Sequence, residues 1–118
     1  MNPFPLDITL VSGDDETLEF KFEETDGTPL DLTDRTYFLE VRSTPQSTGV
    51  ANCTFTCTVP IPVDGVVVAT ADGAQTSGMA PGKGFWWSLL QVTDSTPDGE
   101  TLVWGRVEVI PQVTKVGT

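Results

Sequence analysis

The sequence predicts an all-β chain folded as an immunoglobulin-like antiparallel β-sandwich of about seven strands. Apolar and polar residues alternate from end to end, and no window keeps the helical period of about 3.6 residues. Four Asp-Gly pairs supply turns between the alternating segments. A length of 118 residues is enough for one two-layer core. A small jelly roll or an open barrel is the competing architecture.

The two ends of the chain differ in composition from the alternating middle. We expect an N-terminal arm at residues 1–7, a sandwich domain at residues 8–110 and a C-terminal tail at residues 111–118. The arm contains Asn2-Pro3-Phe4-Pro5, which is stiff and cannot pair fully in a sheet because proline lacks an N–H. The arm holds neither a basic region nor a long apolar run, so we expect the protein to fold in the cytoplasm where it is made.

Three strands are predicted in the first part of the chain, at residues 8–11, 17–23 and 37–42. An acidic turn at residues 12–15 separates the first two, because the residues after it alternate rather than follow a helical period. Asp26-Gly27 begins the connection to the third strand, since Asp-Gly suits a left-handed turn. The side chains that share one face of these strands are Leu18, Phe20 and Phe22, then Tyr37, Leu39 and Val41.

Four more strands are predicted at residues 50–59, 66–70, 85–92 and 101–110. Proline after the first of them ends it, because proline cannot donate to a ladder. The third is apolar on both faces, with Trp86 and Trp87 pointing to opposite sides. The residues expected to point inward from the first and last of the four are Cys53, Phe55, Cys57 and Val59, then Val103, Gly105, Val107 and Val109.

Three connections are predicted from glycine, proline and small polar residues. Residues 43–49 form a loop by composition, and Pro97-Asp98-Gly99 turns the chain into the last strand. Residues 74–82 form a long loop or one short helical turn. Met79 stands alone among polar and small residues in that segment, so we expect it to be exposed.

The two cysteines are predicted to be free, buried thiols. Cys53 and Cys57 lie on one strand, four residues apart. An extended chain rises by about 3.3 Å per residue, so their Cα atoms are about 13 Å apart. A disulfide spans at most about 7 Å between Cα atoms, which excludes a bond between them.

The charge is strongly negative and unevenly distributed. The net charge is −11, which opposes binding to nucleic acid or to an anionic membrane, so neither is expected as a partner. Residues 1–40 carry −9 and residues 41–118 carry −2. The nearly neutral part is the better candidate for contact with a protein partner.

Catalysis and cofactor binding are not expected. The chain has no histidine, and no lysine follows a serine at a nucleophile spacing. Gly82-Lys83-Gly84 lacks the pattern of a phosphate-binding loop. Calcium is the one metal considered, since aspartates offer hard oxygens, but aspartate in turns ordinarily bonds its own backbone. The aspartates concerned are Asp14, Asp15, Asp26, Asp31 and Asp34.

The candidate partner contacts are aromatic or apolar side chains that the core does not account for. At most one of Trp86 and Trp87 lies in the core, and Trp104 has core-facing neighbours on both sides. Tryptophan is enriched at interface hot spots. The candidates are Phe4 in the arm, Met79 in the loop, Trp86 and Trp104.

The order of motifs resembles a family of small proteins. Gly-Asp-Asp at 13–15 leads into Leu-Glu-Phe-Lys-Phe at 18–22 and Asp-Gly-Thr-Pro-Leu-Asp-Leu-Thr at 26–33. Later come Gly-Phe-Trp-Trp-Ser-Leu at 84–89 and Leu-Val-Trp-Gly-Arg-Val-Glu-Val at 102–109. Over residues 8–110 this order resembles the small immunoglobulin-like β-sandwich proteins of tailed-phage virions, which occur as capsid decoration proteins and as tail adaptor domains.

The resemblance implies a non-enzymatic virion structural protein assembled in the host cytoplasm. A capsid decoration protein on the outside of the head is favoured, with the major capsid protein or another virion protein as its partner and self-association as a further expectation. In that role the capsid would be contacted by the arm at residues 1–7, the loop that contains Met79, or the tail at residues 111–118. A tail, baseplate or fibre adaptor is the alternative. Two further alternatives remain. One is a carbohydrate-binding or adhesin module, and the other is a bacterial assembly factor or inhibitor.

Overall fold

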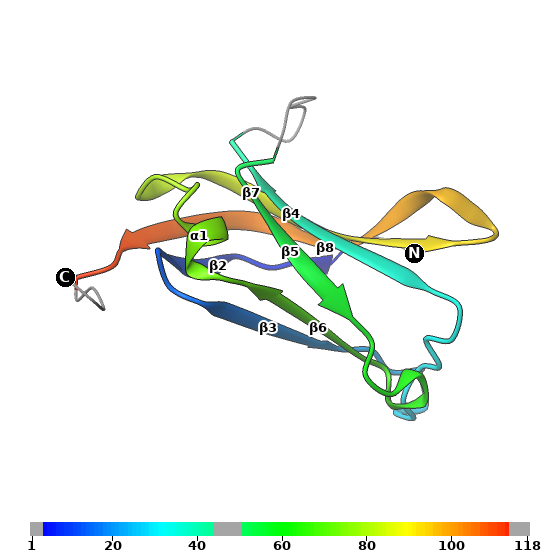
Figure 1. The fold of residues 1–118 in the computed structure, drawn as a ribbon. Coiled ribbons are helices and arrows are strands. Elements are labelled where there is room, and N and C mark those ends of the chain that lie inside the picture. Colours follow the sequence, from blue (N-terminus) through cyan, green and yellow to red (C-terminus); the bar gives the residue numbers. More distant parts are fainter. Residues whose placement is uncertain (1–3, 44–50, 114–118) are drawn as a thin grey trace.

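In the part of the chain that the structure describes, eight strands form a two-sheet β-sandwich, which confirms the predicted all-β, immunoglobulin-like fold (Figure 1). The computed structural model describes residues 4–43 and 51–113. A 3₁₀ turn, η1 (Pro62–Asp64), and one helical turn, α1 (Gly73–Thr76), are the helical elements of these ranges. The strands are β1 (Phe4–Pro5), β2 (Ile8–Ser12), β3 (Glu16–Lys21), β4 (Thr36–Arg42), β5 (Cys53–Thr58), β6 (Val66–Ala71), β7 (Gly82–Thr93) and β8 (Thr96–Pro111).

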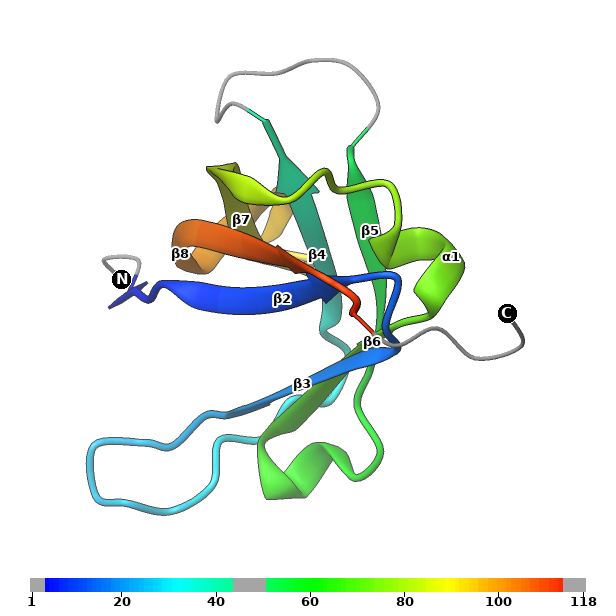
Figure 2. The same ribbon diagram turned by 90° about the vertical axis from the view of Figure 1, so that its left-hand side faces the viewer.

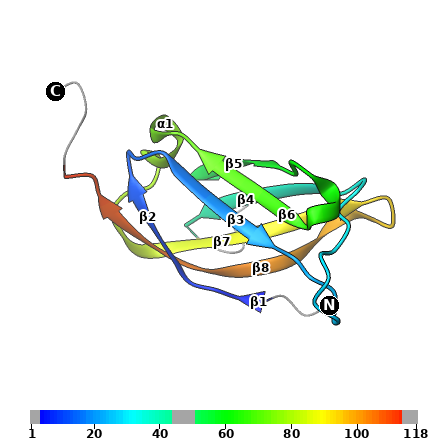
Figure 3. The same cartoon turned by 90° about the horizontal axis from the view of Figure 1, so that it is seen from below.

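The two sheets differ in width and share one strand. The larger sheet runs from β1 and β2 through β8, β7 and β4 to β5, and the smaller one runs from β5 through β6 to β3 (Figures 2 and 3). One half of β5 pairs with β4, at Phe55 opposite Leu39, and the other half pairs with β6, at Cys57 opposite Ala69. The passage of β5 from one sheet to the other closes this margin of the sandwich.

Period-two alternation places one set of side chains between the sheets. Leu39, Val67 and Leu89 are completely buried, whereas their chain neighbours on the same strands face outward. Trp87 is buried and stacks on Phe20 from the opposite sheet, with ring centroids 5.7 Å apart. The inward positions predicted for the last strand are confirmed, since Val103, Gly105, Val107 and Val109 are all buried.

The N-terminal segment is held against β8 by a close approach of backbone atoms. Phe4 and Pro5 form β1, which pairs in parallel with β8, so this part of the predicted arm belongs to the sheet. The carbonyl oxygen of Leu6 accepts a hydrogen bond of 2.8 Å from the indole Nε1 of Trp87. A Cβ atom on Gly105 would lie 1.8 Å from that oxygen, so only glycine permits the contact.

The segment between β6 and β7 is organised by one buried threonine. Asp72 caps α1, and its side chain accepts from the backbone N–H of Gln75. Thr76 Oγ1 accepts from the N–H of Gly13 at 3.0 Å and lies 2.7 Å from the carbonyl oxygen of Asp14, to which it donates. These bonds fasten the predicted short helical turn to the β2–β3 turn.

The prediction that Met79 is exposed is wrong. Met79 has no exposed surface and belongs to the hydrophobic core. Its backbone N–H donates to the carbonyl of Thr76, which folds the chain back at the end of α1. Burial follows because that return directs the side chain between the sheets, and this excludes Met79 as a partner contact.

The last hairpin turns earlier than the sequence predicted. β7 ends at Thr93 and β8 begins at Thr96, with hydroxyl contacts of Thr93 to Ser95 and Thr96 closing the turn. Asp98-Gly99 instead lies within β8, where Gly99 adopts a φ of 92°. A register shift nearby, between Leu89 and Leu90 on β7, accompanies the burial of Leu102, which strict alternation would expose.

Several predicted features lie outside the described residues. These are Asn2 and Pro3 of the arm, most of the predicted loop at 43–49, the predicted start of a strand at Val50, and residues 114–118 of the tail.

Gly105→Ala should destabilise the domain because its methyl group would collide with the Leu6 carbonyl. We expect the free energy of unfolding in urea to fall by at least about 2 kcal/mol. Gly84→Ala on β7 is the matched control, since a Cβ there meets nothing within 4 Å. Equal stability of the two variants would contradict the proposed close approach.

The two cysteines are free thiols, as predicted; Cys53 is buried, whereas Cys57, which was also predicted to be buried, is only partly buried. Burial raises the pKa of Cys53 from 9.0 to about 11, and the negative charge of Asp72 adds to the shift. Burial also raises the pKa of Cys57. The folded protein therefore holds both groups in the protonated form in neutral solution.

This shift predicts a loss of stability in alkaline solution. Between pH 9.0 and about 11 the unfolded chain releases the Cys53 proton while the folded chain retains it, so the free energy of unfolding falls as pH rises. Cys53→Ala should show a smaller fall over the same pH range in urea titrations. Parallel curves for the two proteins would contradict the raised pKa.

Candidate docking face

Three strands of the larger sheet present an aromatic surface on the side away from the core. We call it the tryptophan face. Register sets its layout, because Trp86 on β7 lies opposite Arg106 on β8, and Ser88 lies opposite Trp104. The tryptophan face consists of Phe38, Glu40 and Arg42 on β4, Trp86, Ser88 and Leu90 on β7, and Thr101, Trp104 and Arg106 on β8.

Trp86 is the centre of a stack on this face. Its ring lies 6.2 Å from the ring of Trp104, with planes 18° apart. The guanidinium carbon of Arg106 lies 4.6 Å from the Trp86 ring centroid, within the range of a cation–π contact. Trp86 is half-buried, whereas Trp104 remains 40% exposed. The stack orders two large rings that still present surface to solvent.

The tryptophan face carries a small net positive charge, unlike the whole chain. Arg42 and Arg106 flank Trp86 from the two neighbouring strands, and they are two of the three arginines in the sequence. Arg42 Nη2 donates to Glu40 Oε1 at 2.9 Å. One acid and two bases among nine residues contrast with a net charge of −11, so this face lacks the repulsion that the rest of the surface exerts on an acidic partner.

A shallow groove of about 290 Å³ crosses the tryptophan face. The rings of Trp86 and Trp104 line it together with the Glu40–Arg42 pair and the hydroxyl-bearing residues Ser88 and Thr101. Phe38 lies beyond the groove and is 50% exposed. An apolar centre edged by a few polar groups is typical of a surface that binds a partner.

The structure brings together two of the four predicted contact residues. Trp86 and Trp104 stack on one face, and Trp87 is the member of its pair that fills the core. Met79 is buried inside the sandwich. Phe4 lies in β1 beside Val103, and its role in docking stays a prediction.

Sequence reasoning missed the polar members of the face. Arg42, Arg106 and Glu40 are on strands that were predicted, but their meeting depends on which strands are neighbours and in which register. Alternation did place Arg106 on the same side of its strand as Trp104. This shared side of the strand was the one sequence observation that could have placed Arg106 beside the tryptophan.

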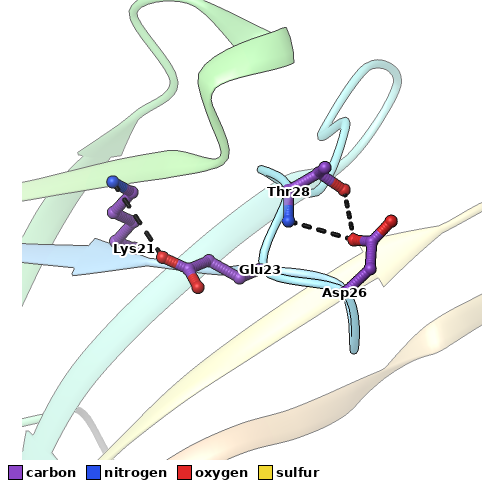
Figure 4. A network of polar contacts seen from close by, with 4 residues as sticks. All are labelled: Lys21, Glu23, Asp26 and Thr28. Atoms are coloured by element: carbon purple, nitrogen blue, oxygen red, sulfur yellow. Dashed lines mark hydrogen bonds and ion pairs between the residues drawn. The ribbon is translucent and has the colours of Figure 1, made fainter.

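Two of the aspartates named as candidate calcium ligands instead stabilise the turns in which they lie. Asp26 Oδ1 accepts from the N–H and the hydroxyl of Thr28, at 3.0 and 2.6 Å (Figure 4). Asp31 accepts the same pair of bonds from Thr33. These hydrogen bonds lower the pKa of both carboxyl groups, the hydroxyl bond having the larger effect.

The aspartates of the first turn also have protein partners. Asp15 accepts from the N–H of Gly73 at 2.9 Å, and Asp14 accepts from the side-chain amide of Gln112. Within residues 4–43 and 51–113, no three acidic or cysteine side chains gather as metal ligands would. In the same ranges no helix has the length and apolar character needed to cross a membrane.

One similar solved structure is titled "Crystal structure of the Lin-41 filamin domain", with 13% sequence identity and a TM-score of 0.40 over 86% of this chain and 81% of that one. No conclusion about function follows from a similarity at this level. No protein-family model matches the sequence, and no curated protein matches it.

Trp104→Ala should remove the stack while leaving the fold intact. We expect the exciton signal of the two indoles to disappear from the circular dichroism spectrum, with a loss of only about 1 kcal/mol in unfolding free energy. Phe38→Ala changes another exposed aromatic residue of the same face and should preserve the signal. An unchanged spectrum for Trp104→Ala would contradict the stacking of Trp86 and Trp104.

Proposed function

We propose that this chain is a non-enzymatic structural protein of a tailed-phage virion, docking as a capsid decoration protein on the outside of the head. In this proposal the tryptophan face binds the major capsid protein or another virion protein. The chain assembles in the host cytoplasm and acts in the virion without a cofactor, nucleic acid or membrane.

The observation that carries the docking role is the ordered, half-exposed stack of Trp86 with Trp104 and Arg106. Tryptophan and arginine dominate interface hot spots, and a preformed stack loses little side-chain entropy on binding. The assignment to a virion is supported by the order of sequence motifs described above. The acidic turns, such as those at Asp26 and Asp31, then face solvent and keep the particles soluble.

Two alternatives have support of their own. The same sequence motifs fit a tail, baseplate or fibre adaptor, which would dock through the same face. A carbohydrate-binding or adhesin module is favoured by one feature of the groove, namely that tryptophan rings lie beside a Glu40–Arg42 pair and two hydroxyl-bearing residues. Sugars bind to such a combination of ring faces and hydrogen-bonding groups.

Binding to purified phage particles tests the proposal. Heads that lack the protein and isolated tails of the same phage are each incubated with the wild-type chain and with Trp104→Ala. We expect the wild type to bind heads, and the variant to bind them about thirtyfold more weakly, as for a hot-spot residue. Val63→Ala serves as the control, because Val63 is 61% exposed on η1, outside the tryptophan face.

The other outcomes separate the alternatives. Binding to tails and not to heads would overturn the decoration role and support an adaptor. Binding to a glycan array that is lost in Trp104→Ala, with no binding to either particle, would support the carbohydrate-binding module. Equal binding of heads by Trp104→Ala and the wild type would show that docking uses another surface.

A further inference from the structure

The margin of the smaller sheet at β3 is open. β3 pairs with β6 along residues Glu16–Lys21, and no other strand of the described residues pairs with β3 (Figure 3). The opposite margin differs, because β5 joins both sheets there. An unpaired strand edge is a template for another strand.

The backbone groups at this margin can be assigned from the neighbouring hydrogen bonds. Phe22 N–H donates to the carbonyl oxygen of Gly65 at the start of β6, so even-numbered residues of β3 direct their N–H and C=O groups toward β6. The odd-numbered residues Thr17, Glu19 and Lys21 therefore direct theirs toward the open margin.

Apolar side chains beside this margin are incompletely covered. Leu18 and Phe20 point inward but are only half-buried, whereas Leu39 and Leu89, which point inward from the larger sheet, are fully buried. A strand added next to β3 would remove apolar surface from water along its inner side.

The charges on β3 select a partner and a register. Glu19 and Lys21 are both exposed on its outer side, two residues apart. In an antiparallel pair of two β3 strands related by a two-fold axis at Phe20, each Glu19 lies opposite Lys21 of the other copy. The same register places Phe20 opposite Phe20 and Leu18 opposite Phe22. Registers centred on Glu19 or on Lys21 instead place like charges opposite each other within β3. In the register centred on Phe20, Glu16 and Glu24 are also like charges opposite each other, but Glu24 lies beyond the end of β3.

We infer that two copies of this chain associate through antiparallel pairing of their β3 strands, in the register centred on Phe20. The odd-numbered residues then exchange backbone hydrogen bonds between the copies, and two Glu19–Lys21 pairs lie across the axis. Lys21 already lies 4.0 Å from Glu23 of its own chain, on the same side of the strand (Figure 4). The contact is one strand wide, which predicts a weak dimer. This inference does not depend on the proposed function.

Charge reversal tests the pairing. Sedimentation equilibrium is measured from micromolar to millimolar protein for the wild type, Glu19→Lys, Lys21→Glu and the double variant Glu19→Lys/Lys21→Glu. Each single reversal places like charges opposite each other twice, so we expect each to weaken dimerisation about tenfold. The double variant restores opposite charges and should dimerise as the wild type does.

A backbone variant tests the same edge independently. Thr17→Pro removes an N–H that the monomer does not use, and proline is tolerated on edge strands. We expect it to weaken the dimer, while Thr17→Ala does not. A wild-type chain that stays monomeric at millimolar concentration would overturn the inference. So would a dimer equally stable in the two single reversals and the double variant, whether or not Thr17→Pro folds.

Discussion

The contact between the Leu6 carbonyl, Gly105 and the Trp87 indole is the constraint on which the larger sheet depends. A residue with a side chain at 105 would displace the N-terminal segment, because its Cβ would lie 1.8 Å from the Leu6 oxygen. With glycine there, β1 and β2 both pair with β8, and Trp87 gains an acceptor for its only donor. A buried indole without that acceptor would be left with an unsatisfied N–H.

The same contact determines what the outer face presents. Because Trp87 points inward to reach Leu6, the alternation of β7 turns Trp86 outward, where it meets Trp104 and Arg106. Core and candidate docking face are therefore two sides of one strand. The stack is held by neighbouring strands of the sheet rather than by a loop, which suits a surface that binds a partner without rearrangement.

The two margins of the sandwich differ in whether they expose an unpaired strand edge. At one margin β5 belongs to both sheets, so no strand edge remains between them. At the other, β3 ends the smaller sheet with its odd-numbered backbone groups directed outward. The opposite charges of Glu19 and Lys21 limit which strand can add there. A partner strand must place a basic residue opposite Glu19 and an acidic residue opposite Lys21. The fold therefore presents two separate features to solvent, an aromatic face and an unpaired strand edge.

The sequence alone determined the all-β class, the position of most strands and their inward sides, because period two is a local property of the chain. It also determined that Cys53 and Cys57 are unpaired, from their spacing on one strand. Tertiary structure decided what depends on contacts distant in sequence: the burial of Met79, the turn at Thr93 rather than at Gly99, and the register between β4, β7 and β8. That register assembles the tryptophan face, and no local pattern encodes it, since cross-strand neighbours are set by the whole sheet.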